Sequence, residues 1–275
     1  MKQSFELKTL IKSIFSNNLL HSNGNNLLTS VIIDSSHKIN KNKVENYFKD
    51  FYSLQGWLSI FAAKTILWLD FIQKQEKIEG NLFEIGVYLG KSSILFGLFA
   101  DQEKERLGLC DHFKAGERRK IPQKEILYKN LNSYFDNLEF IDIYDKESIA
   151  LTLDECKNSR MFHIDGGHTF VQLTNDLQLA ETAIIDKGLI IIDDFFNPRC
   201  PEVTEGVYKY LDKGTLTPIM VGFMKLVLCK KSMYKWYFEK INTLGWKNYI
   251  NNEKIDFLNR KMFGYNILTG GQQAN

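Results

Sequence analysis

The sequence predicts an α/β fold in which helices cover a mostly parallel sheet, and three observations lead to this prediction. From residue 82 to residue 229, short apolar runs alternate with longer segments of helical periodicity. Most connections between the runs are long enough for a helical crossover, which parallel strands require. The last two runs are separated only by Gly222, which predicts that the last strand is antiparallel.

Seven strands are expected, at residues 82–85, 106–110, 138–143, 161–164, 189–192, 216–221 and 223–229. Helices are expected between them, at residues 91–101, 122–135, 169–185 and 202–212. Residues 1–80 have helical periodicity, strongest over 57–72, and no linker rich in glycine or proline separates them from the first strand. We therefore expect a helical cap at 1–80, a core at 81–230, and an aromatic-rich helical tail at 231–275 that packs on the core or covers a pocket or a dimer surface.

Composition excludes several classes of protein. The chain has 275 residues, 44% of them hydrophobic, which suits a large globular core. A formal net charge of +2 gives no basic footprint for nucleic acid. The most apolar stretch, residues 57–72, contains Lys64 and Asp70 and is too short to span a membrane. The four cysteines form no CxxC pair, and the N-terminus has no signal-peptide pattern, so we expect a cytoplasmic protein with reduced thiols.

The most informative segment is the one from Leu82 to Ser92, which reads as a buried strand, a glycine turn and the start of a helix. Glycine lets the backbone approach a ligand closely, and a helix N-terminus offers free N–H groups. The strand ends with Glu84, whose charge disfavours a phosphate and favours a cationic ligand group. S-adenosylmethionine, with its ammonium and sulfonium, has such groups.

Two other nucleotide-binding patterns are alternative interpretations of this turn. Gly86 to Ser92 ends in Gly-Lys-Ser, as a phosphate-binding loop does, but only three residues separate its glycines where that loop needs four. The same spacing lacks the G-x-G-x-x-G pattern that holds the pyrophosphate of NAD. An NTPase stays open as an alternative at this level, as does an ordinary strand–turn–helix without a ligand.

Acidic residues lie at the ends of three of the predicted strands. Asp111 ends the second strand, where a carboxylate commonly accepts hydrogen bonds from ribose hydroxyls. Asp165 ends the fourth strand, and Asp193 and Asp194 follow the fifth. If these two strands are neighbours, the three carboxylates converge and repel one another unless a cation compensates them. Mg²⁺ or Mn²⁺ would suit such oxygen ligands, although each aspartate could instead cap a turn.

His168 lies three residues after Asp165, across a glycine turn, and is the candidate general base. Asp165 is the alternative proton acceptor. His163, on an apolar strand, is expected to be a core residue.

Three segments in this order resemble class I S-adenosylmethionine-dependent methyltransferases: residues 83–92, 163–169 and 191–198. They are most similar to the metal-assisted O-methyltransferases that modify sugar hydroxyls in macrolide and aminocoumarin biosynthesis. The resemblance covers residues 80–230 and implies a Rossmann-like fold. It implies that the methionyl part of the cofactor is held by Glu84, Gly86, Tyr88 and Gly90, with Ser92 beside them, and the ribose by Asp111. It also implies metal ligands at Asp165, Asp193 and Asp194 and a base at His168.

The expected activity is therefore methyl transfer to a hydroxyl of a sugar or another small metabolite, by a protein that can form a homo-oligomer. A protein that binds S-adenosylmethionine without turnover is the alternative from another class.

Overall fold

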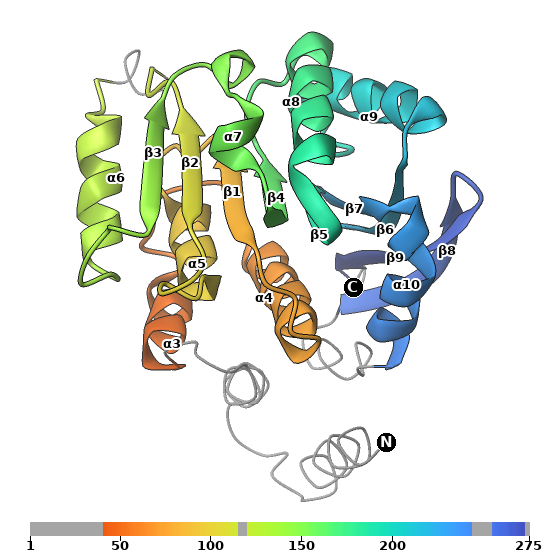
Figure 1. The fold of residues 1–275 in the computed structure, drawn as a ribbon, viewed down its shortest axis with the longest axis horizontal. Helices are drawn as coiled ribbons and strands as arrows, with labels where there is room; N and C mark the ends of the chain where they lie inside the picture. The colour runs from red at the N-terminus through yellow and green to blue at the C-terminus, as the bar shows by residue number, and fades with distance from the viewer. Residues whose placement is uncertain (1–40, 115–119, 244–254, 273–275) are drawn as a thin grey trace, which may run out of the picture.

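A nine-stranded sheet forms the centre of the computed structural model, which describes residues 41–114, 120–243 and 255–272 (Figure 1). The strands lie in the order β3-β2-β1-β4-β5-β7-β6-β9-β8. Their bounds are β1 Asn81–Ile85, β2 Leu107–Asp111, β3 Ile141–Asp145, β4 Ser159–Ile164, β5 Ile184–Ile192, β6 Leu216–Gly222, β7 Lys225–Lys230, β8 Ile255–Met262 and β9 Tyr265–Gln272.

Helices cover both faces of this sheet. They are α3 Lys41–Asp50, α4 Ile60–Gln75, α5 Lys91–Phe99, α6 Gln123–Asn132, α7 Leu153–Cys156, α8 Phe170–Ala183, α9 Pro201–Lys213 and α10 Tyr234–Thr243. Helices α3 to α6 and α10 contribute to the hydrophobic cluster on one face, and α7 to α9 contribute to the cluster on the other (Figure 1). Two short 3₁₀ turns, Ser148–Ala150 and Lys231–Met233, complete the described elements.

The predicted α/β class and strand directions are confirmed. Strands β1 to β5 pair in parallel, and β7 is antiparallel to both of its neighbours. Strand β3 begins three residues later than predicted, and the strong helix of the cap begins at Ile60. The tail differs from the prediction. It is helical in α10, but β8 and β9 form a hairpin that extends the sheet beside β6. Residues 1–40 of the predicted cap lie outside the described residues.

The helices of the described residues include none that is both long and apolar enough to cross a membrane.

The carboxyl ends of β1, β4 and β5 finish side by side and form the edge that carries the site. The backbone N–H of Asp165 donates to the carbonyl of Ile85 at 2.8 Å, and that of Asp193 donates to the carbonyl of Ile164 at 2.9 Å. Gly86 has φ +85°, and a Cβ there would lie 1.8 Å from the carbonyl oxygen of Asp165. Only glycine fits this close approach, so the turn after β1 is held directly against the end of β4.

A buried arginine ties the cap to the opposite end of the sheet. Arg160 is fully buried, and its guanidinium donates to Asp70 of α4 at 2.7 Å and to Glu105 before β2 at 2.8 Å. It also donates to the carbonyl of Phe99 at the end of α5. Because buried carboxylates need partners, this cluster fixes α4 and α5 against β4.

We predict that Arg160→Leu lowers the free energy of unfolding by about 3–5 kcal/mol, because it leaves Asp70 and Glu105 buried beside no guanidinium. Arg106→Leu is the matched control, since Arg106 pairs with Asp142 at the surface. It should cost no more than about 1 kcal/mol. Urea unfolding of the two variants measures both changes, and equal changes would contradict a structural role for the buried cluster.

Candidate functional site

The turn between β1 and α5 is held by Asp111 at the end of β2. The Asp111 carboxylate accepts the backbone N–H groups of Val87 at 3.0 Å, Tyr88 at 2.8 Å and Phe113 at 2.7 Å. Tyr88 has φ +49°, and Gly90, the N-cap of α5, has φ +86°. Such a backbone is strained for a tyrosine, and the hydrogen bonds from Val87 and Tyr88 to this carboxylate stabilise the turn in this form.

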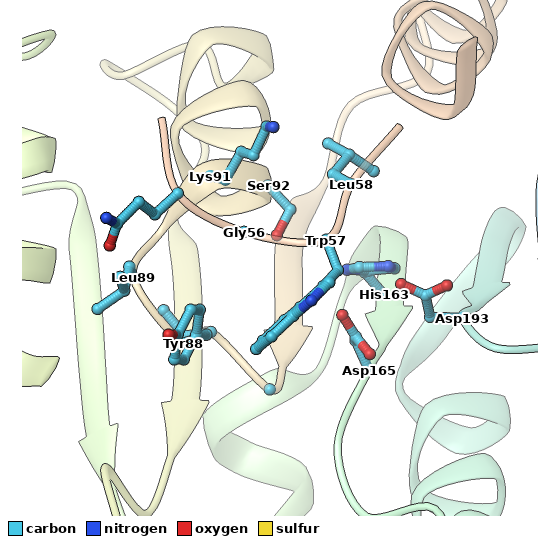
Figure 2. A pocket seen from close by; sticks show the side chains of 13 residues that line it. Gly56, Trp57, Leu58, Tyr88, Leu89, Lys91, Ser92, His163, Asp165 and Asp193 are labelled. Atoms are coloured by element: carbon cyan, nitrogen blue, oxygen red, sulfur yellow. The ribbon is translucent and has the colours of Figure 1, made fainter. Parts of the chain in front are cut away.

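Below this turn lies a cavity whose volume is about 30 Å³, enough for about one water molecule (Figure 2). Residues 55–58 pass over it, and the Trp57 ring lies against the Tyr88 ring with centroids 4.8 Å apart. A ligand of nucleotide size fits here only when residues 55–58 move away. The Trp57 side chain in this segment is 72% exposed.

The structure separates the predicted cofactor residues into two sets. Gly86, Tyr88 and Ser92 line the cavity. Three others do not: Gly90 caps α5, Asp111 holds the turn, and Glu84 is fully buried. Glu84 accepts a hydrogen bond from the Ser93 hydroxyl and lies 2.9 Å from Nδ1 of His163. The Glu84 carboxylate is turned into the core and does not line the cavity, so its direct contact with the ligand stays a prediction.

Lys91 is not placed to hold a phosphate. Lys91 lines the cavity, but its ammonium end is directed away from it (Figure 2) and lies 3.9 Å from the ring centroid of Phe51. Burial lowers the pKa of Lys91. In a phosphate-binding loop this lysine contacts the phosphates. The position of Lys91 therefore argues against an NTPase.

The three predicted metal ligands form two groups, not one. Asp165 and Asp193 lie together with His163, and their ligand atoms are all within 4.8 Å of one another. Asp194 lies in a second group, with His168 and Cys200. Asp194 has φ +57°, a turn that directs its side chain away from Asp193. The structure therefore does not bring the three aspartates into one cluster, and their role as metal ligands stays a prediction.

The pair Asp165 and Asp193 has a high density of negative charge. Burial, followed by the charge of Asp193, raises the pKa of Asp165 to about 7. The only cation in contact with Asp193 among the described residues is the ammonium of Lys225, which is buried at the start of β7. Because β7 runs antiparallel to β5, with Leu226 opposite Ile192, Lys225 falls beside Asp193. The second positive group near this pair is His168, whose Nε2 lies 4.0 Å from the Asp165 carboxylate.

His168 forms an ion pair at the mouth of the site. Its Nε2 is 2.9 Å from the Asp194 carboxylate and 4.0 Å from that of Asp165. Hydrogen bonds to Asp165 and Asp194 raise the pKa of His168 to about 10, and His168 in turn lowers the pKa of Asp194 to about 2. In this arrangement His168 is an imidazolium at neutral pH, and it accepts a proton only after losing its own.

Three features of the site were missed from the sequence. His163 is buried, as predicted for a core residue, but it also lines the cavity, which was not predicted. The signal was present, because residues 163 and 165 are two apart on a strand and share a face. The position of Lys225 in the site depends on the register of β7, and the position of Trp57 depends on how the cap packs. A local sequence pattern predicts neither position.

Residues 83–195 match the family model of a methyltransferase domain. Among solved structures, the O-methyltransferase NovP is similar at 17% identity with a TM-score of 0.52, covering 82% of this chain and 98% of that chain. Cofactor-bound Rv0187 from MTB is similar at 13% identity with a TM-score of 0.50, covering 72% of this chain and 93% of that chain. At these identities the likeness concerns the fold. No curated protein matches the sequence.

Residues 83–195 therefore form a methyltransferase domain, with the strand order and the glycine turn of the class I fold. This domain makes the protein an enzyme that transfers a methyl group from S-adenosylmethionine.

We predict that His168, followed by NMR in the presence of EDTA, titrates well above the ordinary imidazole pKa of about 6.5. The charged form is the stabilised one, so the ion pair supports folding below pH 6.5 and this support is lost as pH rises through the folded-state pKa. Asp194→Asn should lower the pKa of His168 toward 6.5. Asp193→Asn, its matched control, should change it less, because Asp193 makes no contact with His168. A wild-type pKa at or below 6.5 would contradict the ion pair.

Proposed function

We propose that the protein methylates a hydroxyl of a small-molecule acceptor, a sugar or a comparable metabolite, with the help of a divalent cation such as Mg²⁺ or Mn²⁺. The observation that carries this proposal is the position of two close carboxylates, Asp165 and Asp193, in the same cavity as the glycine turn. Ligands of such sheets lie at the carboxyl ends of the strands, which is where this cavity lies.

The residues of the cavity fit a cation. Asp165 and Asp193 offer oxygen donors, and Nε2 of His163 is a buried nitrogen without a hydrogen-bond partner among the described residues. When bound, a divalent cation would act as a Lewis acid toward the acceptor oxygen and hold it in place. An acceptor with neighbouring hydroxyls, such as a sugar, has the oxygens that a hard cation takes up beside protein carboxylates.

In the proposed reaction the methyl group passes from the sulfonium sulfur to the hydroxyl oxygen. The carbon–sulfur bond breaks as the carbon–oxygen bond forms, S-adenosylhomocysteine leaves, and the hydroxyl proton is released. Such an in-line displacement depends mainly on positioning. Asp111 contributes by fixing the turn that faces the donor. The unprotonated form of His168, oriented by Asp194, would take the proton.

The test is a thermal shift of the full chain with two ligands. We expect S-adenosylhomocysteine at 100 times its Kd to add about 2.7 kcal/mol to the free energy of unfolding. ATP with Mg²⁺ should add nothing. Because residues 55–58 must move for the ligand to enter, binding should also change the tryptophan fluorescence, and Trp57→Phe should remove most of that change. Stabilisation by ATP and not by S-adenosylhomocysteine would contradict the proposal.

A pair of variants locates the ligand. Asp111→Ala should weaken S-adenosylhomocysteine binding by about tenfold or more, because a charged acceptor of three backbone N–H groups is lost. Asp145→Ala is the matched control: Asp145 is opposite Asp111 on β3, is exposed, and pairs with Lys124 outside the cavity. Equal affinities of the two variants would place the donor elsewhere.

A further inference from the structure

His163 carries a nitrogen that the protein itself does not use. The side chain is 1% exposed, and its Nδ1 lies 2.9 Å from the Glu84 carboxylate. A carboxylate only accepts hydrogen bonds, so Nδ1 carries a proton, and in the neutral imidazole Nε2 is the nitrogen with the free lone pair. Glu84 is held in turn by the hydroxyl of Ser93. The ring orientation is therefore fixed, and so is the direction of the lone pair.

That lone pair has no hydrogen-bond partner among the described residues. A buried polar atom without a partner is costly and needs an explanation. The ring lines the cavity and lies beside the carboxylates of Asp165 and Asp193 (Figure 2). The three potential ligand atoms lie within 4.8 Å of one another. Donors of one ion at bond lengths of about 2.0–2.2 Å lie up to about 4.4 Å apart, so small side-chain rotations would close the site.

We infer that His163 is a direct ligand of the divalent cation, together with Asp165 and Asp193, and that Glu84 orients it. This inference rests on the proposed function and assigns its cation site. A histidine that donates one ring N–H to a carboxylate and binds metal through the other nitrogen is a common arrangement in metalloproteins. A mixed set of imidazole and carboxylate donors suits Mn²⁺ or Fe²⁺ better than Mg²⁺, which prefers oxygen alone.

Asp194 is not part of this site. Its carboxylate lies 2.9 Å from His168, accepts from the Asn197 amide at 2.5 Å, and lies near the Cys200 thiol. These partners account for its hydrogen-bonding capacity. Lys225, by contrast, contacts Asp193 and adds a positive charge beside the proposed ion. Removing that charge should strengthen cation binding.

The test uses Mn²⁺ alone as the probe, on the full chain after removal of metals with a chelator. Electron paramagnetic resonance counts bound Mn²⁺, and its pulsed form detects a directly coordinated ¹⁴N nucleus. We expect one bound Mn²⁺ with a ¹⁴N coupling in the wild type. His163→Gln should lose the coupling and weaken Mn²⁺ binding at least tenfold. Glu84→Gln should weaken it by about 10–100-fold.

Asp194→Asn is the matched control and should keep the Mn²⁺ affinity within about twofold. Lys225→Met should bind Mn²⁺ more tightly, because it removes a positive charge beside Asp193. This variant tests the position of the ion even if His163→Gln does not fold. Absence of a ¹⁴N coupling in the wild type, or a loss of Mn²⁺ in Asp194→Asn but not in His163→Gln, would overturn the inference. So would a His163 variant that loses only S-adenosylhomocysteine.

Failure of the inference and failure of the proposed function give different results. If the wild type is stabilised by S-adenosylhomocysteine but its Mn²⁺ has no nitrogen ligand, methyl transfer stands and the assignment of His163 falls. If S-adenosylhomocysteine does not bind, the proposed function falls whatever Mn²⁺ does.

Discussion

The hydrogen bond between Glu84 and His163 connects the two central strands at the point where the site begins. The two residues are opposite one another in the register of β1 and β4, and both are buried. A carboxylate in this position is costly unless it is paired, and the imidazole and the Ser93 hydroxyl provide that pairing. Since Ser93 belongs to α5, the same carboxylate also fixes the helix that follows the glycine turn.

The Glu84–His163 pair and the ends of β4 and β5 determine where the charged groups of the site lie. Residues 84, 163, 165 and 193 are brought to one side of the sheet by the alternation along each strand, and three of them line the cavity. Asp194 follows with a left-handed backbone and joins His168 on the other side of the turn. Asp193 and Asp194, although adjacent in the sequence, thereby belong to two different groups of side chains.

Much of this arrangement is visible in the sequence. The alternation of strands and helices identifies the sheet, and the acids after β2, β4 and β5 identify its functional edge. The orientation of Glu84 is not visible, because β1 is buried on both faces and its hydrophobic pattern does not distinguish them. The separation of Asp193 from Asp194 depends on one backbone angle. The hairpin of β8 and β9 depends on pairing with β6, which an aromatic-rich helical periodicity does not report.

The account rests on one claim, that the methyl donor and the divalent cation share a single pocket at the ends of β1, β4 and β5. Nuclear relaxation of ¹³C-methyl S-adenosylmethionine tests this claim directly, since bound Mn²⁺ relaxes only nuclei near it. With both bound to the full chain and no acceptor present, the account predicts strong enhancement of methyl relaxation in the wild type and its loss in Asp193→Asn. Unchanged methyl relaxation while both remain bound would contradict a shared pocket.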